Sequence, residues 1–192
     1  MSQNPSAAVG QVSADGQFRW DGTQWVPIPR GAREPTSWTR PMQLAAASLL
    51  AVDAIVTVAT YLIFYTHDAV KKVFDASGSQ LPQGSSEDQV ITFTIVGAIA
   101  FAVFLALLEL FGALGAVLRW RWVFWYVLAL MGLGSLGGVI GIFGLFRTGN
   151  SPFPIGVVIL QELLSLAAIP MFVWMLVGVI TRGPWAMKRP GT

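Results

Sequence analysis

The chain has 192 residues, of which 54% are hydrophobic and 11% charged, and its formal net charge is +2. Soluble domains have about a quarter of their residues charged, so this composition predicts a membrane protein. The small charge, with its basic residues near helix ends, argues against nucleic-acid binding. With no cysteine and one histidine, the sequence excludes disulfides and thiolate metal sites, and we expect no metal or other cofactor.

The polar N-terminal segment, residues 1–40, contains a predicted β-hairpin. The aromatic, β-favouring runs 17–20 and 23–26 lie on either side of Asp21-Gly22, a pair typical of tight hairpin turns. We therefore expect a hairpin at about 17–28, followed by a linker rich in proline and arginine.

Two interpretations of the hairpin's tryptophans remain open. Trp20 and Trp25 could form a docking surface for a protein partner. Alternatively, the two rings pack on each other or rest on the membrane surface. An isolated two-stranded hairpin is marginally stable in water, so some packing partner is expected in either case.

The run Arg19-Trp-Asp-Gly-Thr-Gln-Trp25 resembles the Trp-Asp-Gly-x-x-Trp core of a short domain of unknown function. That domain precedes transmembrane segments in many actinobacterial membrane proteins. The resemblance is confined to residues 17–28, and the Pro-Gly-Trp-Tyr-x-Asp-Pro stretch that usually leads the domain is absent. It implies a cytoplasmic or membrane-proximal module in a bacterial protein and assigns no activity.

Four apolar stretches, at about 42–64, 89–118, 122–146 and 155–181, are long enough to cross a bilayer. A spanning helix needs about 20 apolar residues, because every backbone polar group in lipid must be satisfied within the segment. We therefore predict an all-α membrane protein. Its four-helix transmembrane bundle would occupy residues 41–182, between the small N-terminal cytoplasmic β-hairpin and a cytoplasmic tail at 183–192.

Positive charge is divided unevenly between the two sides of these spans. Nine lysines and arginines lie on the side of the termini and three on the other, and short loops rich in positive charge resist translocation. Both termini are therefore predicted to be cytoplasmic, and the four spans are predicted to lie in the plasma membrane. The basic tail 185–189 is also suited to anionic headgroups. Four tryptophans fall at the predicted inner boundaries, where an indole can keep its N–H hydrated: Trp38, Trp120, Trp122 and Trp185.

Three acids, Asp53, Glu109 and Glu162, lie inside the predicted spans, which contain no lysine or arginine. An ionised carboxylate in hydrocarbon costs at least a few kcal/mol, so each acid is a candidate protonatable site. The helical rise of about 1.5 Å per residue places Asp53 and Glu109 at similar depths and Glu162 nearer the outer face. If the first two spans are neighbours, Asp53 and Glu109 could share one proton.

The third predicted span is rich in glycine. Gly132, Gly134 and Gly137 match a dinucleotide-binding pattern, but that mechanism requires a strand, a turn and a helix N-terminus in water, so we reject it. Small residues at helical spacing instead indicate close helix packing, within the molecule or, less favoured, in a homo-oligomer. The candidate packing residues are Gly134, Gly137, Gly138, Gly141 and Gly144.

Two functions follow from these patterns. His67 and Asp68 are adjacent, but no positioned serine or second histidine accompanies them, so we predict no enzyme. The first interpretation is a non-enzymatic accessory or scaffold-like membrane component, in which the buried acids join helices by hydrogen bonds. The alternative is a small proton-coupled transporter or channel-like oligomer that uses those acids.

Overall fold

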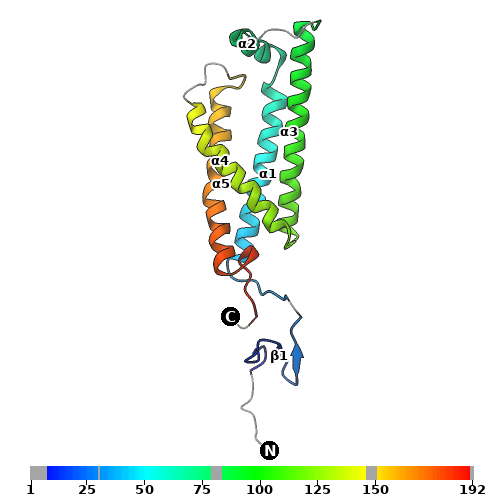
Figure 1. Cartoon of the computed structure of the whole chain (residues 1–192), viewed down its shortest axis with the longest axis vertical. Helices are drawn as coiled ribbons and strands as arrows, with labels where there is room; N and C mark the ends of the chain where they lie inside the picture. Colours follow the sequence, from blue (N-terminus) through cyan, green and yellow to red (C-terminus); the bar gives the residue numbers. More distant parts are fainter. Residues whose placement is uncertain (1–7, 30, 79–83, 146–150, 191–192) are drawn as a thin grey trace, which may run out of the picture.

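The computed structural model describes residues 8–29, 31–78, 84–145 and 151–190. It is a bundle of long helices with a small strand-containing part beyond one end (Figure 1). We call residues 8–29 the N-terminal module. Its strands are β1 (Phe18–Trp20) and β2 (Trp25–Pro27). The helices are α1 (Thr39–Phe64), α2 (His67–Ser77), α3 (Glu87–Val117), α4 (Val123–Leu145) and α5 (Ile155–Thr181), and a single 3-10 turn, η2 (Pro184–Ala186), follows.

Four helices, α1, α3, α4 and α5, are long and apolar enough to cross a membrane. The predicted fold class, a four-helix bundle with a small N-terminal hairpin, is confirmed. α3 begins two residues before the predicted span because Ser86 and Gln89 form a capping box, in which each side chain accepts from the other's backbone N–H. The predicted end of the third span, at residue 146, lies outside the described residues.

The long helices pack as two pairs, α1 with α3 and α4 with α5. Contacts between α1 and α5 and between α3 and α4 join the pairs. Figure 1 shows α1 beside α3, with α4 slanting across the bundle. Small side chains allow close packing of α3, and its buried alanines are Ala102, Ala106, Ala113 and Ala116.

The buried core lies in the half of the bundle where α1 begins and α5 ends, which we call the terminal end. Met42 and Leu50 of α1, Phe124 and Val127 of α4 and Met175 of α5 belong to one cluster of buried side chains. At the opposite end α2 lies against α3. Lys71 of α2 forms ion pairs there with Asp75 and Glu87, and His67 Nε2 lies 3.3 Å from the Asp88 carboxylate.

The N-terminal hairpin has a longer loop than predicted. Trp20 pairs with Trp25, so four residues close the hairpin instead of Asp21-Gly22 alone. The Asp21 carboxylate accepts hydrogen bonds from the backbone N–H groups of Thr23 and Gln24, both at 2.7 Å, and this turn chemistry favours the wider loop. Residues 10–13 add a third extended segment along β1, with Gly10 N–H donating to the Trp20 carbonyl at 2.8 Å.

The expected linker before α1 and the tail after α5 pair with each other at the terminal end. Glu34 and Lys188 exchange backbone hydrogen bonds of 2.8 and 3.0 Å, and the Thr36 hydroxyl donates to the Ala186 carbonyl at 2.8 Å. Arg33 Nη1 donates to the carbonyls of Arg182 and Met187. We call residues 33–39 together with 183–188 the terminal strap.

Trp185 is fully buried, so the prediction that its indole N–H is hydrated is wrong. Its ring packs edge-on against Phe124 at 5.2 Å between centroids, and its Nε1–H donates to the Trp120 carbonyl at 3.2 Å. Gly183, at φ 103°, and the left-handed residues Trp185 and Ala186 turn the chain back under the bundle. This turn aims the indole into the core, where the Trp120 carbonyl replaces water as its acceptor.

Candidate functional site

Two of the three predicted acids meet in the structure. Asp53 of α1 and Glu109 of α3 are half-buried, and their carboxyl groups are within reach of a mutual hydrogen bond. The Tyr126 hydroxyl of α4 donates to the carbonyl of Leu108, the residue before Glu109, at 2.9 Å. One proton shared by the two acids would relieve the repulsion between paired carboxylates in an apolar layer. The pair therefore joins α1 to α3, with α4 alongside.

The acid pair has no described route to water. Glu109 Oε2 is buried without a hydrogen-bond partner. Neither acid of the pair lines the cavities described around the N-terminal module and beside α2. This arrangement suits a hydrogen bond between helices better than a proton pathway.

Glu162 belongs to the other helix pair. Its carboxyl group lies directly against Gly141 of α4, and its Oε1 is buried without a partner among the described residues. The electrostatic interactions of Asp53 and Glu109 do not include it. The structure thus brings together two of the three candidate acids and places the third at the α4–α5 interface.

Some of the candidate packing glycines face α5, and at least one faces open space. A Cβ on Gly138 would lie 2.9 Å from the Ser165 carbonyl carbon, and one on Gly134 would lie 3.4 Å from the Ala168 Cβ. With Gly141 against Glu162, these glycines let α4 approach α5 closely. Gly137 faces open space, and the surroundings of Gly144 lie outside what the structure describes.

The candidate docking residues share one face of the hairpin. Phe18 and Trp20 lie on one face because alternate residues of a strand point the same way. Trp25 shares that face because it is paired directly with Trp20 across the hairpin. Trp20 and Trp25 contact each other with ring centroids 5.5 Å apart, yet Trp25 remains 39% exposed and Phe18 36%. Trp20 itself is half-buried. The two expected uses of these rings, mutual packing and an exposed surface, therefore coexist.

A groove of about 460 Å³ lies beside these rings, lined by residues 13–15 together with Phe18 and Trp25. We call it the aromatic groove. Hydrogen bonds from the Ser13 hydroxyl and the Gln17 N–H lower the pKa of Asp15, so the groove carries a carboxylate at neutral pH. Sequence reasoning missed Phe18 and Asp15 as parts of this surface, although the Ser13-x-Asp15 spacing is typical of a local turn.

No family model, curated protein or solved structure matches the chain. The class of protein is therefore inferred from the architecture of the chain alone. The four long apolar helices are those of a multi-pass integral membrane protein.

Proposed function

We propose that the protein is a non-enzymatic accessory or scaffold-like component of a bacterial plasma membrane, with its N-terminal module and C-terminal tail in the cytoplasm. The aromatic groove is its docking site for a protein partner. The observation that carries this proposal is the exposure of Phe18 and Trp25 beside one groove, on the same face of the module. Exposed aromatic rings around a groove are typical anchors for partner side chains.

The chemistry of the aromatic groove favours one kind of partner. Asp15 supplies a negative charge, and the Trp25 ring can take a cation on its face. The groove accommodates a short segment of polypeptide rather than a domain. The partner is therefore a protein segment that presents a basic side chain next to an apolar one.

Two contacts also tie the N-terminal module and the linker after it to the terminal end of the bundle. Arg19 of β1 forms an ion pair with Glu34, whose backbone pairs with the tail. Arg121 Nη1, from the α3–α4 connection, donates to the Gly31 carbonyl at 2.9 Å. A scaffold needs its docking surface at a set height above the membrane, and these contacts supply that constraint.

Site-specific photo-crosslinking tests the docking face. A photoreactive amino acid replacing Trp25 is expected to give a discrete protein adduct in native membranes, and Asp15→Asn in the same chain is expected to weaken that adduct. The matched control is the same amino acid at Val26, which is 41% exposed on the same strand but points to the opposite face. Equal adducts from both positions, or an adduct insensitive to Asp15→Asn, would contradict the proposal.

The facing carboxyl groups of Asp53 and Glu109 favour a second candidate, a small proton-coupled transporter. If the pair only joins helices, Asp53→Asn and Glu109→Gln retain hydrogen-bonding groups and leave the proton permeability of proteoliposomes at the wild-type level. Glu162→Gln, which changes an acid outside the pair, is the control. Proton flux through the wild type that is lost in the first two variants and kept in the third would establish the transporter instead.

A further inference from the structure

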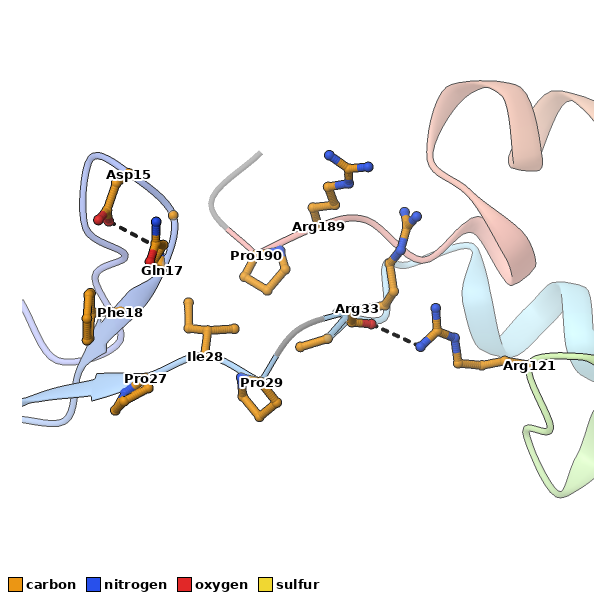
Figure 2. Close-up of a pocket in the computed structure, with 13 residues that line it drawn as sticks. Asp15, Gln17, Phe18, Pro27, Ile28, Pro29, Arg33, Arg121, Arg189 and Pro190 are labelled. Carbon is orange, nitrogen blue, oxygen red and sulfur yellow. Dashed lines mark hydrogen bonds between the residues drawn. The ribbon is translucent and has the colours of Figure 1, made fainter.

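A larger cavity, of about 860 Å³, lies between the N-terminal module and the terminal end of the bundle. Three arginines from distant parts of the chain line it: Arg33 of the terminal strap, Arg121 of the α3–α4 connection and Arg189 of the tail. Figure 2 shows these arginines on the bundle side of the cavity, with Asp15 and Phe18 across it on the module. We call it the arginine cavity.

Positive charge in the arginine cavity exceeds negative charge. Asp15 is the one carboxylate among its lining residues. Arg33 and Arg121 donate to backbone carbonyls, and neither forms an ion pair with a carboxylate within the described residues. Carbonyl acceptors hold a guanidinium in place without neutralising it, and its five donors leave several for another ligand. An anion is therefore the complementary occupant.

The planar fork of arginine suits the oxygens of a phosphate group, which it can bind through two parallel hydrogen bonds. The cavity also has an apolar wall, formed by Phe18, Pro27 and Ile28. A site with basic and apolar walls fits an amphipathic phosphate ester better than a bare inorganic ion.

The position of Arg121 indicates where such a ligand would come from. It lies between Trp120 and Trp122, whose rings stack at 6.0 Å and are 37% and 59% exposed. Exposed tryptophans at the end of a spanning helix mark the level of the lipid headgroups. The arginine cavity thus lies next to that level.

We propose that the arginine cavity binds a phosphate-bearing anionic group supplied by an acidic phospholipid. Arg33 and Arg121 approach the phosphate from the bundle, and Phe18 and Ile28 contact the glycerol portion. The arginine cavity shares Asp15 and Phe18 with the aromatic groove, but its three arginines do not line that groove. A bound headgroup would fill the space between the N-terminal module and the bundle.

The test uses the full chain in nanodiscs of phosphatidylcholine containing one-fifth phosphatidylglycerol, with retained lipid counted by native mass spectrometry after release into detergent. The wild type is expected to retain phosphatidylglycerol, and Arg33→Gln and Arg121→Gln are each expected to weaken that retention about tenfold, the effect of losing one charged hydrogen-bonding partner. Arg40→Gln is the control, because Arg40 lies at the same end and also donates to a carbonyl, that of Val117, but does not line the cavity.

Retention that is equal in all four proteins, or that falls as much in Arg40→Gln, would overturn the site. Unchanged helical circular dichroism in the variants shows that a loss is not due to unfolding. A second arm adds inorganic phosphate or glycerol 3-phosphate, at the ionic strength of a chloride control. Persistence of the bound lipid supports the headgroup as the source, whereas displacement by either soluble phosphate overturns that assignment and makes the cavity a site for a soluble phosphate.

Discussion

Replacing Trp185 with alanine is expected to lower the free energy of unfolding by about 3–5 kcal/mol, the range for truncating a fully buried large aromatic side chain. The substitution removes the contact with Phe124 and leaves the Trp120 carbonyl without its donor. It also empties the largest side-chain volume in the fully buried core. Thermal unfolding in detergent, followed by near-ultraviolet circular dichroism, measures the loss.

Trp122→Ala is the matched control for this experiment. Trp122 lies at the same end of the bundle but is 59% exposed, and its contacts are ring contacts with Trp120 and Phe111. Its removal is expected to cost about 1 kcal/mol. Trypsin should also cut after Lys188 sooner in Trp185→Ala than in Trp122→Ala, because the tail loses its anchor. Equal melting temperatures for the two variants would contradict the structural role of Trp185.

Gly138→Ala is expected to destabilise the bundle by about 1–3 kcal/mol, the usual cost of overpacking. The new methyl group would lie 2.9 Å from the Ser165 carbonyl carbon and 3.1 Å from the Leu166 nitrogen. These are backbone atoms, which cannot rotate aside as a side chain does. The α4–α5 pair must therefore separate, and thermal unfolding in detergent again measures the effect.

The neighbouring substitution Gly137→Ala supplies the comparison. A Cβ at this position meets nothing within 4 Å. Alanine also favours the helix by up to about 1 kcal/mol relative to glycine, so the variant should be neutral or slightly more stable. If both alanine variants lose the same stability, close packing of Gly138 against α5 is not the cause of the loss.

Features that depend on local composition could be predicted from the sequence. Hydropathy placed the four long helices, because lipid requires an apolar residue at nearly every position of a span. The rise per residue placed Asp53 and Glu109 at similar depths, so the two acids could be predicted to meet if their helices are neighbours. The four-residue spacing of Gly134 and Gly138 likewise anticipated a face suited to close packing.

Features that depend on contacts between distant segments could not be predicted. The pairing of Glu34 with Lys188 has no local sequence signal, so no contact between the linker and the tail was predicted. The burial of Trp185 depends on left-handed backbone at two residues that are not glycine, a conformation that their identities do not indicate. The third segment of the N-terminal module, residues 10–13, was missed because it lacks the alternating apolar pattern of a strand.

The terminal strap links correct insertion in the membrane to assembly of the module. Its backbone pairing joins residues 34 and 188, so it can form only after all four long helices have been synthesised. The two residues must also lie on the same side of the bilayer, which requires an even number of crossings between them. A chain in which one of the four helices failed to insert would hold them on opposite sides, and the strap would stay open. Burial of Trp185 in the core therefore marks a molecule whose topology is complete.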